Sequence, residues 1–280
     1  MANTASHKSF GTRLCTMLKV DFKRLLLSRT FYIIVAACLV APILILVMTT
    51  MMDGTVSTNP QTGEETVIEG FDNVWQIIGS VSAPSENGGS EQDASAGAAA
   101  MDMSITAMCN INMLYFAIAA LVCIFVSEDF RSGYSKNLFT VRAKKSDYVA
   151  SKTLTLSFGA AAMVLAFFVG SLIGGAVSGL SFAMEGFGIG NLVFCILSKI
   201  VLVSVFVPIY LVMSVIAKQK LWMSILLSVG VGMFLFMMIP MLTPLNATVL
   251  HVILCAAGGV GFCAGLGAVS NIILRKTALV

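Results

Sequence analysis

Few residues of this chain combine the type and the spacing that chemistry at a site requires. His7 and His251 each lack a second metal ligand at helical spacing, so the sequence predicts no metal site. The chain has no G-x-x-x-x-G-K-[ST] phosphate loop, and the glycines of GFGIG, residues 186–190, follow a long apolar segment. We therefore expect no catalytic residue, no cofactor bound by this chain, and no nucleic acid among its partners.

The elements that must carry any function are apolar. Of the 280 residues, 58% are hydrophobic and only 11% are charged, far below the roughly 25% charged that is typical of a soluble globular domain. A bilayer core of about 30 Å needs about 20 apolar residues per helix. Windows free of Asp, Glu, Lys and Arg, apart from one lysine, cover 30–52, 103–127, 153–184, 186–217 and 221–274.

The last of these windows is too long for one crossing. It is interrupted by PMLTPLNAT, residues 240–248, whose prolines cannot continue a helix and whose polar residues favour a turn. Six spanning helices result. The sequence thus predicts an all-α integral membrane protein with six transmembrane helices.

The distribution of Lys and Arg predicts the orientation of these helices. With both termini in the cytoplasm, sixteen of the 17 Lys and Arg residues lie on the cytoplasmic side, and ten of the 14 Asp and Glu residues lie outside. We therefore expect a multi-pass protein of the cytoplasmic membrane with both termini inside.

The expected organisation has thirteen consecutive parts. They are a cytoplasmic N-terminus with an amphipathic helix, 1–29; a first span, 30–52; an acidic extracellular loop, 53–102; a second span, 103–127; a cytoplasmic segment, 128–152; a third span, 153–178; an extracellular loop, 179–190; a fourth span, 191–217; a cytoplasmic turn, 218–220; a fifth span, 221–239; an extracellular loop, 240–248; a sixth span, 249–273; and a cytoplasmic tail, 274–280.

Lys199 is the charge inside the fourth apolar window, and it invites a functional hypothesis because a lysine at the bilayer centre costs about 2.5 to 3.5 kcal/mol. Counted back from Lys218 at about 1.5 Å per residue, Lys199 lies roughly 28 Å away, at the outer boundary of the bilayer. We favour an amine that reaches the water there over a buried partner or a substrate contact, and the alternatives stay open.

The segment 10–29 predicts an amphipathic helix. One face carries Leu14, Met17, Leu18, Phe22 and Leu25, and the other carries Arg13, Thr16, Lys19, Lys23 and Arg24. A basic amphipathic helix before a span lies in the membrane interface, where anionic lipid attracts it. It serves either as an anchor or as an elbow helix that contacts a cytoplasmic partner.

The first extracellular loop combines acidity with a short apolar stretch. Glu64, Glu65 and Glu69 would suit a cationic ligand, and the alternative is a merely solvated face. Residues 67–81 predict a short helix in which Trp75 either dips into the outer leaflet or packs on the outer ends of the spans. We take these four residues as candidate substrate contacts, together with Lys199.

Pairs of glycines at four-residue spacing recur within the apolar windows. Such pairs let helix backbones approach closely in lipid, so they predict a tight bundle without any chemistry. The pairs are Gly170 and Gly174, Gly175 and Gly179, and Gly261 and Gly265.

The segment SEDFRSGYSKNLFTVRAKKSDYVASK, residues 127–152, mixes charge with an apolar handle made by Phe130, Tyr134, Leu138 and Phe139. Aromatic and arginine side chains concentrate binding energy at interfaces, so the handle predicts a docking surface. The alternative is an ordinary basic loop on the cytoplasmic side.

This segment resembles the cytoplasmic loop between helices two and three of ABC-2 class permeases, the membrane subunits of ABC exporters. Members of that class often show an acid four residues before a glycine, then a lysine-asparagine pair, a basic residue, and a lysine that opens helix three. The matching positions are Asp129, Gly133, Lys136, Asn137, Lys145 and Lys152. Tyr134 stands where Thr is usual, and Lys145 stands where Arg is usual.

The resemblance extends to LKVDFKRLLLSRTFYIIV, residues 18–35, and to the architecture of six helices with a large first exterior loop. It implies a bacterial cytoplasmic membrane, two copies of a separate ABC ATPase subunit that binds ATP and Mg, and a second permease subunit, identical or similar. The implied ATPase-coupling residues are Asp129, Phe130, Gly133, Tyr134, Lys136, Asn137, Leu138, Phe139 and Lys145.

Chains of this size with an acidic, Trp-containing first loop resemble permeases that export antimicrobial peptides such as lantibiotics or confer immunity to them. A cationic peptide is then the implied substrate. Two alternatives remain: a non-transporting membrane sensor or assembly protein, and a small-molecule or lipid exporter of the same class.

Overall fold

The computed structural model describes residues 10–54, 56–58, 65–67, 74–79, 111–140, 144–184, 186, 188–218, 220–236 and 238–276. These residues are mainly helical. The elements are α1 (Phe10–Leu27), α2 (Arg29–Met52), β1 (Val56–Thr58), β2 (Glu65–Val67), α3 (Val74–Gly79), η2 (Ile111–Met113), α5 (Leu114–Arg131), α6 (Tyr134–Thr140), α7 (Lys145–Ser178), α8 (Ile189–Ala217), α9 (Leu221–Phe236), α10 (Ile239–Leu242) and α11 (Val249–Lys276).

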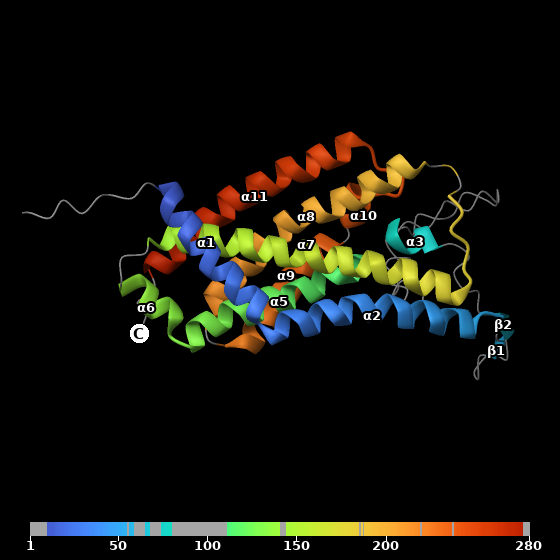
Figure 1. Cartoon of the computed structure of the whole chain (residues 1–280), viewed down its shortest axis with the longest axis horizontal. Helices are drawn as coiled ribbons and strands as arrows, with labels where there is room; N and C mark the ends of the chain where they lie inside the picture. The colour runs from blue at the N-terminus through green and yellow to red at the C-terminus, as the bar shows by residue number, and fades with distance from the viewer. Residues whose placement is uncertain are drawn as a thin grey trace, which may run out of the picture.

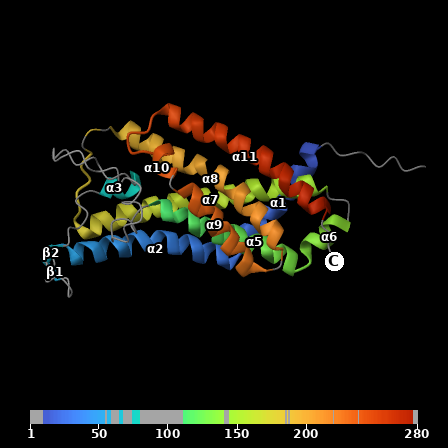
Figure 2. The same ribbon diagram turned by 180° about the vertical axis from the view of Figure 1, so that it is seen from behind.

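The long helices run side by side, with α1 and α6 at one end of the bundle and α3, β1 and β2 at the other (Figures 1 and 2). Four of them, α2, α7, α8 and α11, are long and apolar enough to cross a membrane, with mean hydropathies between 2.1 and 2.9. The two strands form only a short antiparallel hairpin, in which Val56 pairs with Val67. The chain is therefore a predominantly α-helical, membrane-embedded protein.

Two expected spans are shorter in the structure. The helix α9 has 16 residues, and α5 has 18, the last of which include Glu128, Asp129 and Arg131. Residues 103–110, where the second span was expected to begin, lie outside the described residues. Length and composition therefore support four membrane-spanning helices. The helices α5 and α9 pack beside them in the same bundle.

The helix α8 is the centre of the bundle. It contacts α5, α7, α9 and α11, and 72% of its most apolar window is buried inside the protein. Aromatic rings fill the space between α5 and α8: the centroids of Tyr115 and Phe206 lie 4.6 Å apart, and those of Phe206 and Tyr210 lie 5.9 Å apart. Such tilted ring pairs contribute packing energy beyond their buried area.

Glycines let α7 approach α2. A Cβ added at Gly170 would overlap the carbonyl oxygen of Leu39, and one added at Gly174 would lie 2.9 Å from Cα of Ile43. At Gly175 the same atom would overlap the side chain of Val74 in α3. These three glycines therefore allow close contact of helix backbones and side chains, as small residues do in membrane bundles.

The other glycines singled out from their spacing behave differently. Gly179 follows the last residue of α7 with a φ of 69°, so it ends the helix in the left-handed conformation that favours glycine. An added Cβ at Gly261 or Gly265 would meet no atom of another element within 4 Å among the described residues, so the expected close approach is not made there in that part of the chain. Gly259 takes that role in α11, since its added Cβ would overlap Oγ of Ser204 in α8.

Candidate functional site

The segment that resembles a coupling loop lies at one end of the bundle, where α1, α6, the end of α5 and the start of α7 meet (Figure 1). The helix α5 ends at Arg131, and Gly133 then adopts a φ of 71°. Because glycine takes this left-handed conformation without steric cost, the chain can reverse within two residues and begin α6. The seven-residue α6 is thereby held against the end of α5.

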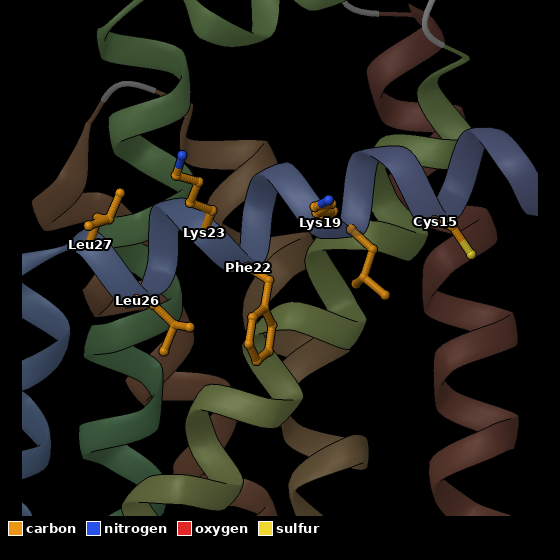
Figure 3. Close-up of a pocket in the computed structure, with 7 residues that line it drawn as sticks. Cys15, Lys19, Phe22, Lys23, Leu26 and Leu27 are labelled. Carbon is orange, nitrogen blue, oxygen red and sulfur yellow. The ribbon is translucent and has the colours of Figure 1, made fainter.

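The helix α1 lies across the ends of the spanning helices (Figure 3). Its buried residues, Met17, Asp21 and Leu25, recur every four positions and so share one face, which packs on α7. The chain then turns at Ser28, whose extended backbone separates α1 from α2. Phe22 and Leu26 point along the spanning helices in Figure 3, and Lys23 points the opposite way.

Four charged side chains from α1, α5 and α7 form one cluster at this end, the charged cluster of Asp21, Arg24, Asp129 and Lys152. Lys152 Nζ lies 2.8 Å from Asp21 Oδ1 and 2.7 Å from Asp129 Oδ2. Arg24 Nη1 lies 2.8 Å from Asp129 Oδ1 and 3.9 Å from Asp21 Oδ1. The side chains of Asp21, Asp129 and Lys152 are fully buried.

Neutral groups complete the charged cluster. The Tyr148 hydroxyl donates a hydrogen bond of 2.9 Å to Asp129 Oδ2, and the Ser151 hydroxyl donates one of 2.6 Å to Asp21 Oδ2. The Arg24 guanidinium lies 4.0 Å from the centroid of the Tyr134 ring in α6. This cation–π contact connects α6 to the cluster.

The charges of the cluster balance, with two carboxylates and two cations. Partial burial acts to lower the pKa of Arg24, but the charge and hydrogen bond of Asp129, together with the nearby Tyr134 and Asp21, outweigh it, and the pKa is raised above its ordinary value. Burial and the charge of Asp21 raise the pKa of Tyr134, so its phenol stays neutral at pH 7. A buried charge is tolerated when it is paired in this way, and removing one partner leaves an uncompensated charge.

The apolar handle expected on this segment is turned inward. Phe130 is buried, while Leu138 and Phe139 are half-buried and pack against the core. The ring of Phe139 lies 5.4 Å from that of Tyr148 and 5.7 Å from Lys145 Nζ, which also donates a hydrogen bond to the carbonyl oxygen of Leu274. An amphipathic helix buries its apolar face against the bundle, so the exposed surface is polar instead.

The outer surface of this end is formed by Arg131, Ser132, Lys136, Asn137 and Thr140, all exposed. Asp129 is fully buried and so does not belong to that surface. Four of the six matching positions therefore form two groups. Lys136 and Asn137 face outward, whereas Asp129 and Lys152 meet inside the protein.

Lys199 does not reach the water, and the expectation that it would do so is wrong. Its side chain is 1% exposed, and its amine donates a hydrogen bond of 3.0 Å to Oδ1 of Asn112. The Tyr115 hydroxyl donates a hydrogen bond of 2.9 Å to the carbonyl oxygen of Lys199. Because α5 and η2 cover this part of α8, the depth counted along one helix did not predict the burial of the amine.

Trp75 packs on the ends of the spanning helices that lie opposite the charged cluster. Its indole Nε1–H donates a hydrogen bond to the carbonyl oxygen of Phe182, and its ring stacks on that of Phe168 at 6.5 Å between centroids. The side chain is therefore engaged within the protein instead of facing a ligand or the lipid. Glu65 lies in β2, while Glu64 and Glu69 lie outside the described residues.

Sequence reasoning missed Asp21 and Arg24 as members of a site. Arg24 was placed on the basic face of the amphipathic helix, and Asp21 is one of the four acids that were expected inside and given no role. A signal was present, because Asp21 is the one acid among the first 29 residues and stands three positions before Arg24. That spacing brings two side chains to the same face of a helix.

The charged cluster holds several helices to one another. Because three helices contribute charges to the cluster and α6 contributes a ring, the cluster connects α1, α5, α6 and α7. Comparison of the chain with protein-family models, with curated proteins and with solved structures gives no match.

Replacing Asp129 with asparagine will destabilise the protein by about 3 to 5 kcal/mol, because Lys152 and Arg24 would then share only the charge of Asp21. The measurement is the thermal unfolding midpoint of the purified protein in detergent. Glu128→Gln is the matched control: it removes the same charge from the neighbouring, exposed position and should change stability by less than about 0.5 kcal/mol. Equal midpoints for the two variants would show that the cluster contributes nothing.

Proposed function

We propose that this chain is the membrane subunit of a bacterial exporter of the ABC-2 permease class, driven by separate ATPase subunits. The observation that carries the proposal is the meeting of Asp129 and Lys152. Both are positions of the resemblance, and their side chains lie 2.7 Å apart in a buried ion pair. Two positions that are far apart in the segment thus meet in one structural contact.

In the proposed mechanism, α6 seats in a groove of an ATPase subunit. The exposed Lys136 and Asn137 would face that partner, and Gly133 would aim the helix at it. ATP and Mg would be bound by the partner, present in two copies, and closure of the ATPase pair would push α6. Transport requires that the ATPase contact the two states of the permease differently, because a ligand shifts an equilibrium only by its differential affinity.

The charged cluster supplies the stiffness that this mechanism needs. Ion pairs and hydrogen bonds hold α1, α5 and α7 to one another, and the ring of Tyr134 holds α6 to Arg24. A push on α6 would therefore move the ends of three helices as one body instead of bending a loop. We propose that this motion opens a path between this chain and a second permease subunit, identical or similar.

The proposal includes six spans with both termini in the cytoplasm of the bacterial cell. In that arrangement α5 and α9 cross the membrane beside α2, α7, α8 and α11. The buried Asp129 and the exposed Glu128 and Arg131 then stand at the inner end of α5, on the side where the ATPase is found.

Reversing the charge of the exposed surface should release the ATPase. With Arg131→Glu and Lys136→Glu together, we expect at least about tenfold less ATPase to co-purify from the membrane, a loss of about 1.4 kcal/mol of binding free energy. Lys218→Glu and Lys220→Glu together are the matched control, since both lysines are also exposed but belong to the turn between α8 and α9. Unchanged ATPase binding in the double variant would contradict the coupling role of α6.

The same preparation separates the permease from a sensor or an assembly factor. A permease complex hydrolyses ATP faster when its substrate is added, whereas a sensor complex would assemble without that stimulation. A chain that co-purifies with no ATPase at all would also fit a sensor and would contradict the proposed function.

For the cargo we propose a cationic antimicrobial peptide, attracted by the acidic first loop. Electrostatic attraction between exposed charges weakens as salt is added, because ions screen it. Neutralising Glu64, Glu65 and Glu69 together should therefore lower the resistance of cells to such a peptide, most clearly at low ionic strength. Resistance that does not change would count against capture of the peptide by this loop.

A further inference from the structure

A groove of about 750 Å³ runs between α7 and α11, with α8 at its floor. Its lining is mainly apolar and comes from Val149 and Leu154 of α7, Val201 of α8, and Val260 and Ala264 of α11. Phe10, the first residue of α1, stands at one end together with Asn271. None of the residues of the charged cluster lines this groove, so it is separate from the proposed coupling site.

We propose that this groove binds one acyl chain of an anionic phospholipid, with the headgroup at the end formed by Phe10 and Asn271. The proposal does not depend on the function proposed above. It rests on the dimensions of the groove, on the small residues that open it, and on the charge at its end.

The length of the groove matches one leaflet. Along α11 it extends from Ala256 to Asn271, which is about 22 Å at about 1.5 Å per residue. Half of a bilayer, hydrocarbon and interface together, is about 20 to 22 Å thick. A lipid of one leaflet can therefore lie along the whole groove with its headgroup at the Asn271 end.

Small residues open the groove toward the outside of the bundle. Ala264, Gly267 and Ala268 stand along α11 where larger side chains would fill the space. Only 11% of the apolar window of α11 is buried inside the protein. In a membrane such an apolar surface has acyl chains as its natural neighbours, since water would leave the surface unfavourably hydrated.

One end of the groove is polar and basic. Arg275 and Lys276 are exposed in the last turn of α11, and Lys144 is exposed just before α7. Asp147, which follows the groove residue Ser146, is held by Arg13 at 3.0 Å. The charge left at this end is positive and attracts an anionic headgroup.

Asn271 adds a hydrogen-bonding group to the polar end of the groove. Its Oδ1 atom is buried and has no hydrogen-bond partner in the part of the chain that the structure describes, although Asn271 lines the groove. A buried acceptor without a donor is costly, so a ligand that brings a donor would gain from it once the amide turns toward the groove. The hydroxyls of a glycerol headgroup are donors of this kind, and phosphatidylglycerol combines them with a negative charge.

The depth of α1 agrees with this assignment. Its residues Leu18, Phe22 and Leu26 border a hollow with Lys19 and Lys23, and in Figure 3 Phe22 and Leu26 point in the direction opposite to Lys23. This is how an amphipathic helix lies at the level of lipid headgroups. Because Phe10 begins α1 and also lines the groove, the groove ends at that level.

The test is photo-crosslinking in nanodiscs of phosphatidylcholine that contain a small amount of phosphatidylglycerol with a diazirine in its acyl chain. Adducts on the intact protein are mapped by mass spectrometry. We expect them on groove residues of α7 and α11, and we expect unlabelled phosphatidylglycerol to suppress them more strongly than added phosphatidylcholine does. Removing both charges by Arg275→Gln and Lys276→Gln should lower the adducts by at least about fivefold.

A matched pair of variants tests the groove itself. Gly267→Leu places a side chain in the groove and should lower the adducts by about fivefold or more, because there is no room for both. Gly265→Leu adds the same side chain where an added Cβ meets nothing within 4 Å, and it should leave the adducts unchanged. Both variants must elute at the same volume as the parent protein in size-exclusion chromatography. If Gly267→Leu does not, Ala264→Leu in the same groove replaces it.

Three results would overturn the proposal. Adducts spread evenly around α11, or equally reduced in Gly267→Leu and Gly265→Leu, would show that lipid contacts the helix without a site. If phosphatidylcholine suppressed the adducts as strongly as phosphatidylglycerol, the headgroup would have no role in binding. Cross-links between copies of the chain through Cys263, without lipid adducts, would show that a second copy covers the groove.

Discussion

Charges that have left water must neutralise one another, and this constraint governs how one end of the bundle is built. Asp21, Asp129 and Lys152 are fully buried, and Arg24 is mostly so. Each comes from a helix that could not withdraw without leaving a partner unpaired, a loss of several kcal/mol. The amphipathic helix α1, the end of α5 and the start of α7 are therefore held together by electrostatics as well as by packing. The helix α6 joins them through the contact of Tyr134 with Arg24.

The helix α7 connects this end to the other. It carries Lys152 near its start, Gly170 and Gly174 where it meets α2, and Gly175 where it meets α3. Its 34 residues correspond to about 51 Å of helix, longer than the bilayer core. In the proposed exporter, a displacement imposed at the charged cluster would pass along this helix to the region of Trp75. In the proposed exporter, a single rigid helix would thus link the ATPase side to the outer face.

Features that depend on a single helix could be predicted from the sequence. Apolar windows and the basic amphipathic segment predicted where α1, α2, α8 and α11 would lie, because helix periodicity and span length are local properties. Asp129 and Lys152 were identified by the resemblance. Their contact was not predicted, because the spacing of residues along the chain does not show which residues of two helices pair.

The errors have the same physical origin. The burial of Lys199 depends on Asn112 and Tyr115 from another part of the chain, and the inward turn of Phe139 depends on Tyr148 of α7. Gly261 and Gly265 have the spacing of a packing pair but face away from the bundle. The packing of the whole bundle determines which side of a helix contacts its neighbours. A spacing of four residues alone does not predict that side.

The central claim is that the buried pair of Asp129 and Lys152 holds the charged end together, and a double-mutant cycle measures it most directly. The free energy of unfolding would be compared for the parent, Asp129→Asn, Lys152→Met and the double variant. We expect the double variant to be about 1 to 3 kcal/mol more stable than the sum of the single effects implies, because each single change strands a buried charge. Single effects that add within about 0.5 kcal/mol would contradict the account.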